Sequence, residues 1–183
     1  MIDPTINIYL DAGFYCGNAL QKLLDAGTID KTWKIIAFEP SNNIDIEDKV
    51  AKFDLDIELI KKAVWVDDKG VTFWESGREN AGFIAGTSYS GAPIKKRKVP
   101  SIDFSYFVSQ LPRAYIYCSM DIEGSEYNVL EKMIKDGTIN RINVLEVEFH
   151  HRFMKDYDKE DSLAIISELK KRNINVILKE YLS

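Results

Sequence analysis

The chain has 183 residues, of which 45% are hydrophobic and 29% are charged, and its formal net charge is −5 at pH 7. These values are typical of one globular domain and exclude disordered and fibrous classes. No apolar segment approaches the length of a membrane span, and the negative charge argues against a general attraction to nucleic acid.

The N-terminus and the cysteines favour a cytoplasmic protein. Residues 1–5 lack the basic start and the long apolar stretch of a signal peptide. Cys16 and Cys118 stand in or beside apolar runs without CxxC spacing, so the sequence indicates neither a zinc site nor a disulfide framework. We therefore expect a cytoplasmic location.

The first third of the chain alternates apolar runs with helical patterns. Leucines recur at helical spacing after a glycine loop, and the second apolar run ends at Glu39 and Pro40, where the proline stops the ladder of hydrogen bonds. The expected elements are a strand at 6–10, a helix at 18–24, a strand at 34–38, a weak helix at 45–53 and a strand at 63–66.

Residues 71–100 are expected to leave the core as a loop or hairpin excursion. The run at 71–75 is interpreted as a hairpin partner of the preceding strand. Residues 76–100 mix Gly, Ser and Asn without clear periodicity, so they predict a long loop that contains a short strand. The basic run at 95–98 is interpreted as solvated surface charge rather than as a phosphate site.

The remainder of the chain resumes the alternation. The expected elements are a helix at 104–108, a strand at 114–120, a helix from about 125 to 135, a strand at 142–149, a helix at 161–172 and a strand at 174–178. Strands that alternate with helices imply an α/β fold, a mostly parallel sheet of about six core strands with helices on both faces. Without a linker or a repeat, residues 1–183 are expected to form a single domain.

Acidic residues stand at the ends of four expected strands. Asp11, Glu39 and Asp121 end three of them, and a fourth carries Glu148, followed by His150. Right-handed crossovers place the carboxyl ends of parallel strands on one edge of the sheet, where ligands bind. The sequence therefore predicts a ligand site at this edge.

The loop at 11–17 suits a nucleoside. Gly13 and Gly17 allow a tight turn, and the helix that follows offers unpaired N–H groups. The spacing is GxxxG rather than the GxGxxG of dinucleotide sites, and a bare strand-to-helix turn explains the loop alone equally well. Glu39 stands where a carboxylate can accept both ribose hydroxyls, so the loop and Glu39 together favour a nucleoside site.

Five parts of the chain together resemble the FkbM family of methyltransferases. They are residues 11–17, 37–40, 99–103, 120–126 with 129–130, and 145–148. Their order and spacing agree over nearly the whole chain, and the Phe-Glu-Pro and Asp-Ile-Glu-Gly-x-Glu elements are the specific ones. The resemblance implies a Rossmann-like class I methyltransferase fold, S-adenosylmethionine as the methyl donor, and usually transfer to a hydroxyl of a sugar or other small metabolite.

The resemblance also assigns residues to the donor. It places the loop residues at the methionine end, Glu39 at the ribose, Ala63 and Val64 near the adenine, and Asp121 and Glu123 at the transfer site. The expected cofactor-binding residues are Asp11, Gly13, Phe14, Gly17, Glu39, Pro40, Ala63, Val64, Asp121 and Glu123. The chain departs from the family in its brevity, since it has no clear seventh strand and no N-terminal extension. We therefore expect a substrate cover that is reduced or supplied by another subunit.

Methyl transfer requires alignment of donor and acceptor and removal of the acceptor's proton. Asp121, Glu148 and His150 are the candidate bases; His151 is weaker, because neighbouring strand residues point to opposite faces. A histidine titrates near neutrality, although one just beyond a strand is as often structural. The acidic residues, with Glu123 and His150, could instead hold a hard divalent cation, but the sequence does not favour a metal.

Two other classes remain open from the sequence. A nicotinamide-dependent oxidoreductase also combines a glycine loop with an acid after the second strand, although the middle glycine is missing. A non-catalytic S-adenosylmethionine-binding protein of the same fold is the other alternative. The expected partner is a small-molecule or glycan acceptor, and neither nucleic acid nor a membrane is favoured.

Overall fold

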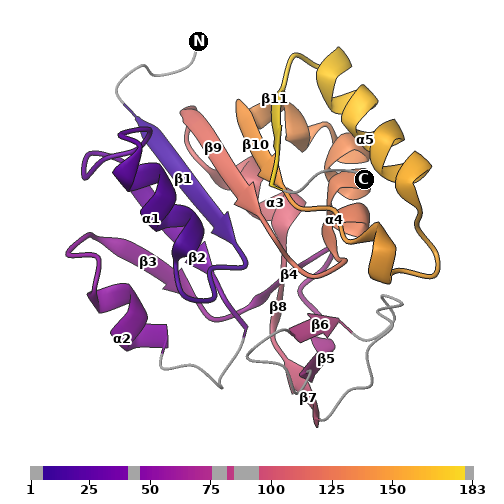
Figure 1. The fold of residues 1–183 in the computed structure, drawn as a ribbon, viewed down its shortest axis with the longest axis horizontal. Helices are drawn as coiled ribbons and strands as arrows, with labels where there is room; N and C mark the ends of the chain where they lie inside the picture. Colours follow the sequence, from indigo (N-terminus) through magenta and orange to yellow (C-terminus); the bar gives the residue numbers. More distant parts are fainter. Residues whose placement is uncertain (1–5, 41–45, 76–81, 85–94, 180–183) are drawn as a thin grey trace.

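The main sheet of the molecule is parallel throughout and six strands wide. The computed structural model describes residues 6–40, 46–75, 82–84 and 95–179. In spatial order the strands are β11 (Asn175–Leu178), β10 (Val144–Val147), β9 (Tyr115–Met120), β1 (Asn7–Ala12), β2 (Lys34–Phe38) and β3 (Ile57–Ile60) (Figure 1). The expected α/β fold with about six core strands is confirmed.

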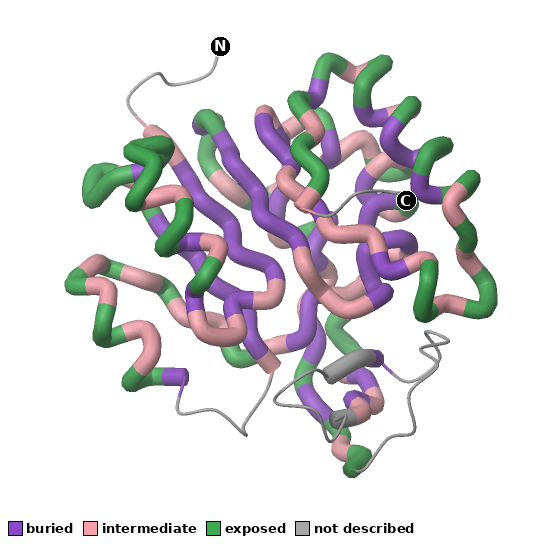
Figure 2. Tube along the Cα trace, in the orientation of Figure 1, coloured by how far each residue is buried: buried purple, intermediate pink, exposed green. Residues whose placement is uncertain are grey.

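Helices cover both faces of this sheet because alternate strand residues point to opposite sides. Tyr9 of β1 belongs to a cluster with Leu20 of α1 (Asn18–Asp25) and Ile46 of α2 (Ile46–Ala51). Ile8 and Leu10 point the other way, into the larger cluster of α3 (Phe104–Gln110), α4 (Glu126–Asp136) and α5 (Lys159–Lys171). The central strands are accordingly buried along most of their length (Figure 2).

The strand order reverses between β1 and β9. From β1 the chain moves outward through β2 and β3, and it later returns to the opposite side of β1 as β9. Ligands of open α/β sheets bind at such a switch point, outside the carboxyl ends of the strands. The fold therefore directs attention to the residues that follow β1, β2 and β9.

Two small sheets lie beside the main one. β4 (Ala63–Trp65) pairs in parallel with β8 (Ser101–Asp103). β5 (Val71–Glu75) pairs antiparallel with both β6 (Gly82–Ile84) and β7 (Lys95–Val99). The rest of the expected excursion, residues 76–81 and 85–94, lies outside the described residues.

Two sequence predictions about this region are wrong. The third core strand is β3, not 63–66; the chain leaves the main sheet after Ile60, and the Ala63 N–H donates to the Pro100 carbonyl at 2.9 Å. β5 pairs with β6 and β7 rather than with 63–66. The basic run at 95–98 belongs to β7, where Lys95, Lys96 and Lys98 are exposed, as expected of solvated charge, and Arg97 is half-buried.

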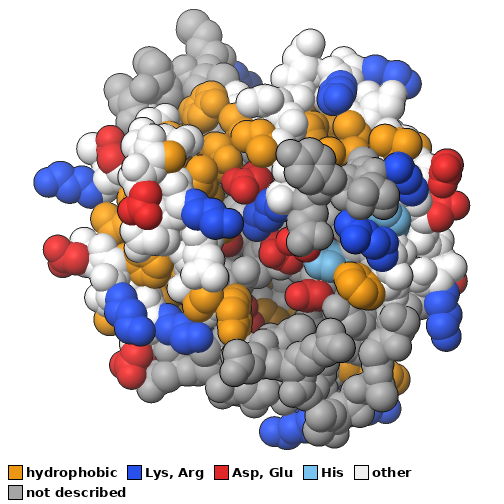
Figure 3. Space-filling model, viewed as in Figure 1, with side chains coloured by type: hydrophobic (Ala, Val, Ile, Leu, Met, Phe, Trp, Pro, Cys, Tyr) orange, Lys and Arg blue, Asp and Glu red, His pale blue; other side chains and the backbone are white. Residues whose placement is uncertain are grey.

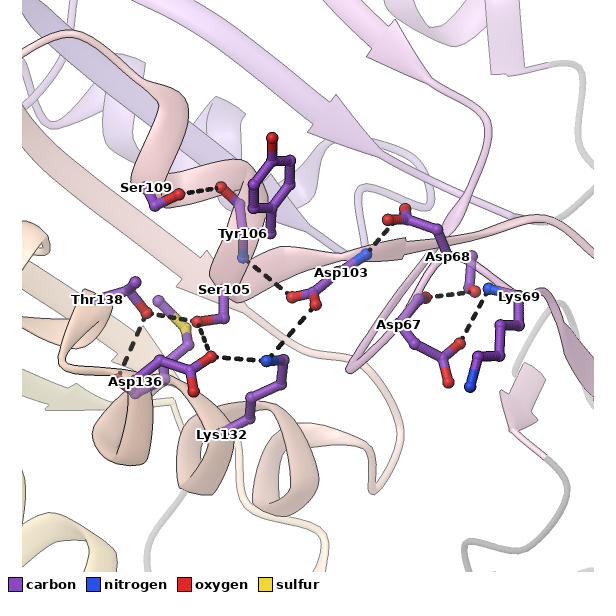
Figure 4. Close-up of polar contacts among 12 residues, drawn as sticks. Asp67, Asp68, Lys69, Asp103, Ser105, Tyr106, Ser109, Lys132, Asp136 and Thr138 are labelled. Carbon is purple, nitrogen blue, oxygen red and sulfur yellow. Dashed lines mark hydrogen bonds and ion pairs between the residues drawn. The ribbon is translucent and has the colours of Figure 1, made fainter.

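The other expected elements are confirmed, with ends that shift by at most two residues. Short 3₁₀ turns, η1 (Thr138–Arg141) and η2 (His151–Phe153), precede β10 and follow it. Asp103 caps α3, since its side chain accepts a hydrogen bond from the Tyr106 N–H at 2.9 Å (Figure 4). Among the described residues, none of the helices is both long and apolar enough to cross a membrane.

Candidate functional site

The ends of β1, β9 and β10 are fixed side by side by backbone hydrogen bonds. The Asp121 N–H donates to the Ala12 carbonyl at 2.9 Å, and the Glu148 N–H donates to the Met120 carbonyl at 3.0 Å. These bonds continue the sheet ladder past its last paired residues, so Asp121 and Glu148 emerge at the same edge. Carboxylate and histidine side chains gather over this edge near a hollow in the face shown in Figure 3.

Gly13 permits the close approach of the first loop to the end of β9. Its φ is +93°, and a Cβ built on it would lie 1.9 Å from the Asp121 carbonyl oxygen. A side chain there would collide with backbone that cannot move without opening the sheet. The glycine predicted to shape the loop is thus required by packing against β9.

A cavity opens directly above this junction. Of the residues expected at the donor, those that line it are Gly13, Glu39, Pro40, Ala63, Val64, Asp121 and Glu123. Phe38, Phe73 and Ile84 add apolar wall. The cavity wall is therefore mostly apolar and contains a few carboxylates, which is the composition of sites for small organic ligands.

Glu39 supplies the carboxylate at the end of β2. The side chain is 6% exposed, and its Oε2 accepts a hydrogen bond from the Tyr15 N–H at 2.8 Å. Tyr15 has a left-handed backbone with φ of +48°, which turns its N–H toward β2. A fixed carboxylate beside the apolar surface of Ala63 and Val64 fits the ribose hydroxyls and adenine of S-adenosylmethionine.

Three of the expected donor residues do not line this cavity. Asp11 is 1% exposed and accepts a hydrogen bond from the Tyr9 hydroxyl at 3.0 Å, so it lies beneath the loop; burial raises its pKa to about 7. Gly17 precedes α1 as its N-cap, with φ of +77°, and packs against Phe53. Phe14 also packs against Phe53 and lines a second cavity instead.

The second cavity adjoins the first at Gly13, Tyr15 and Asp121. Its other polar walls are Asn18 and Lys22 of α1, Glu146 and Glu148 at β10, and Lys179 after β11. The Lys179 ammonium lies 3.8 Å from the Asp121 carboxylate. Asp121 therefore lies between a mostly apolar cavity and a more polar one at the switch point.

His150 lies at the centre of the acidic cluster predicted at the transfer site. Its side chain is 6% exposed, and its Nε2 lies 3.8 Å from Asp121, 3.5 Å from Glu123 and 3.6 Å from Glu148. On the opposite side of the ring, Nδ1 lies 3.0 Å from Oε1 of Glu126. The structure thus brings together all the residues expected at the transfer site.

The charge of His150 follows from these neighbours. Burial by itself lowers the pKa of the imidazole, but the hydrogen bond with Glu126 and the negative charges around the ring outweigh burial and raise the pKa to about 10. At neutral pH His150 is therefore protonated, and its ring has no lone pair with which to take the proton of an acceptor hydroxyl. Asp121 and Glu148 remain as bases.

Sequence reasoning missed four contributors to the site. Phe73 and Ile84 reach the cavity from the excursion. Their strands, β5 and β6, pair with each other, and local sequence patterns do not specify that pairing. Tyr15 contributes through its backbone, which no side-chain pattern reveals. Glu126 is fully buried and accepts hydrogen bonds from both His150 and the Ile122 N–H.

These features define an α/β protein with a parallel sheet, whose ligand-sized cavity lies at the switch point beside an acidic site. Residues 17–175 match the family described as methyltransferase FkbM domain, a span that includes Glu39, Asp121, Glu148 and His150. The chain belongs to this family and is an S-adenosylmethionine-dependent methyltransferase of Rossmann-like fold. No significant match was found among curated proteins or among solved structures.

Proposed function

We propose that the protein transfers a methyl group to a hydroxyl of a sugar or another small metabolite. The observation that carries this proposal is the position of the carboxylates: Asp121 and Glu123 line the donor cavity itself, and Glu148 lies beside them. Carboxylates accept hydrogen bonds from hydroxyl groups and repel phosphates. The acceptor class we infer is therefore a neutral polyhydroxylated molecule or a glycan.

Glu148 is the base in this proposal. Bound S-adenosylmethionine supplies an electrophilic methyl carbon on a positively charged sulfur. As the acceptor oxygen forms its bond to this carbon, the carbon–sulfur bond breaks and its electron pair goes to sulfur, while the hydroxyl proton goes to the Glu148 carboxylate. Asp121, between the two cavities, orients the acceptor hydroxyl in line with the breaking bond.

Two further inferences accompany this proposal. Both cysteines are free thiols, Cys118 buried and Cys16 half-buried, which supports a reducing, cytoplasmic setting. The apolar wall contributed by Phe73 and Ile84 supports a role for the excursion in covering the substrate. Arg97 of β7 tethers this excursion to the donor site, because its guanidinium donates to the Pro40 carbonyl at 2.5 Å.

Transfer of a labelled methyl group from the donor to a panel of sugars, polyols and small phenols tests the proposal. We expect product with at least one hydroxyl acceptor, and we expect Asp121→Ala to abolish transfer while the fold is kept. Glu148→Gln should lower kcat by about 100-fold or more, since general base catalysis contributes roughly 10²–10⁴.

Glu58→Gln is the matched control, because Glu58 is an exposed carboxylate of β3 paired with Lys34, remote from the site. Its turnover should equal that of the parent. Unchanged turnover in Asp121→Ala would remove Asp121 from the mechanism. Donor binding without transfer to any acceptor would favour the non-catalytic alternative.

A further inference from the structure

The spacing of the groups around His150 is unusual for a cluster held by hydrogen bonds alone. Its Nε2 stands 3.5–3.8 Å from three carboxylate oxygens, whereas an N–H···O hydrogen bond spans about 2.7–3.2 Å. The one hydrogen bond of the ring within the described part of the chain is made by Nδ1, on the other side. Three carboxylate oxygens therefore lie near Nε2 at ion-pair rather than hydrogen-bond distances.

This spacing matches ligands that share one cation. Two atoms bonded to the same ion at about 2.1 Å can lie no more than about 4.2 Å apart. One ligand atom from each of Asp121, Glu123 and His150 lies within 4.8 Å of the others, so a movement of a few tenths of an ångström per side chain brings the set into range. We propose that Asp121, Glu123 and His150 bind a divalent cation.

The environment of His150 supports this site independently. A metal-binding histidine almost always donates its second ring N–H to a carboxylate or carbonyl, which fixes the ring's tautomer and orientation. Glu126 fills this role at 3.0 Å, and Glu126 is itself held by the Ile122 N–H at 2.9 Å. Nε2 is thereby aimed at the acidic groups by a buried carboxylate that does not take part in coordination, and a cation that binds there displaces the proton from Nε2.

A second observation points to a polar ligand in the same cavity. Ser125 is 1% exposed and lines the donor cavity together with Asp121 and Glu123. Among the described residues its hydroxyl oxygen has no hydrogen-bond partner. A buried hydroxyl without a partner is costly, and a water molecule of a hydrated cation would satisfy it.

The ligand types select the kind of cation. Two carboxylates and one imidazole suit Mn²⁺ or Mg²⁺, which accept oxygen-rich sets and keep several waters. The vicinal hydroxyls of an acceptor can replace two of those waters on the cation, with Glu148 nearby as the base. This catalytic role rests on the hydroxyl methylation proposed above, whereas the binding of the cation does not depend on it. The sequence alone did not favour a metal; the spacing in the fold does.

Titration of the EDTA-treated chain with Mn²⁺, followed by the EPR signal of the free ion, tests the site. We expect one Mn²⁺ per chain and at least about tenfold weaker binding in Glu123→Gln, since loss of a ligand costs no less than loss of its supporting partner. Glu58→Gln should bind like the parent. Absence of bound Mn²⁺, or equal binding by the two variants, would overturn the proposal.

A spectroscopic measurement separates ligation from general attraction of a cation to acidic groups. The chain has two histidines, so His151→Gln leaves His150 as the only one. Spin-echo EPR of Mn²⁺ bound to this variant should show a nitrogen coupling that changes when the histidine is labelled with ¹⁵N. Bound Mn²⁺ without such a coupling would show that His150 is not a ligand and contradict the proposal.

Both measurements are made without donor or acceptor, so their outcome is independent of methyl transfer. Donor binding measured in parallel by calorimetry distinguishes the two failures. Donor binding without Mn²⁺ binding refutes the cation site alone, and Mn²⁺ binding without donor binding refutes the methyltransferase assignment alone.

Discussion

Single residues at strand ends carry the chemistry of this site, and several of them follow from the sequence. Asp121 and Glu148 are predictable because a parallel sheet brings its carboxyl ends to one edge. The contact between Glu126 and His150 is not predictable from the sequence, since packing brings the start of α4 next to the residue before η2. The protonated state of His150 is equally hidden, because it depends on the sum of the charges around the ring.

The position of Gly13 allows a prediction that depends on a steric clash of an added side chain rather than on backbone flexibility. Gly13→Ala should destabilise the protein by more than about 2 kcal/mol and abolish donor binding, because the new Cβ meets the Asp121 carbonyl oxygen. Gly137→Ala is the matched control: its φ is also positive, at +76°, but nothing lies within 4 Å of the added Cβ. It should cost only about 1 kcal/mol. Urea unfolding that gives equal losses for both variants would show that the collision is relieved.

Among the helices and strands, local patterns predicted most of the main sheet and failed in the excursion. Continuous apolar runs mark β1, β2 and β9, because parallel strands are buried on both faces. β4 and β8 pair across more than thirty residues of chain, a distance at which no local pattern specifies a partner. The basic run of β7 reads as a solvated loop until its antiparallel partner β5 is known.

The cap of α3 allows a prediction at this scale. Asp103 accepts from the Tyr106 N–H and lies 3.5 Å from the Lys132 ammonium (Figure 4). Asp103→Ala should lower the free energy of unfolding by about 1 kcal/mol, mostly through the lost cap. Asp103→Asn keeps a capping oxygen and loses only the charge, so its cost should stay below about 0.5 kcal/mol. If urea unfolding shows equal costs, the ion pair rather than the cap stabilises this helix.

For the molecule as a whole, Asp11 links stability to pH. Burial raises its pKa from 3.8 to about 7, so the folded state favours the protonated carboxyl. The stability that this provides is complete below pH 3.8 and is lost as the pH rises to 7. The free energy of unfolding of Asp11→Asn, relative to the parent, should therefore rise between pH 4 and pH 8 by up to about 4 kcal/mol.

Asp25→Asn corrects this comparison for the removal of one negative charge, because Asp25 is exposed at the end of α1. Urea unfolding of the three proteins across this pH range provides the measurement. A constant difference between Asp11→Asn and the parent would mean that Asp11 is ionised in the folded protein at low pH, contrary to its burial.

The whole-molecule arrangement also decides how the donor is held. Alternation of strands and helices predicted the α/β class, but the place of the cavity depends on the reversal of strand order between β1 and β9. Glu39 follows the next strand along, and its carboxylate is the polar group that distinguishes a nucleoside from a purely apolar ligand. We therefore expect donor binding to depend on Glu39.

Calorimetric titration of S-adenosylmethionine into the parent, Glu39→Ala and Glu58→Gln tests this dependence. We expect one donor per chain for the parent and for Glu58→Gln. We expect roughly 100-fold weaker binding for Glu39→Ala, since two hydrogen bonds to a charged group are lost. No binding by the parent, or a Glu39→Ala affinity equal to that of the parent, would contradict the role of Glu39 in holding the donor.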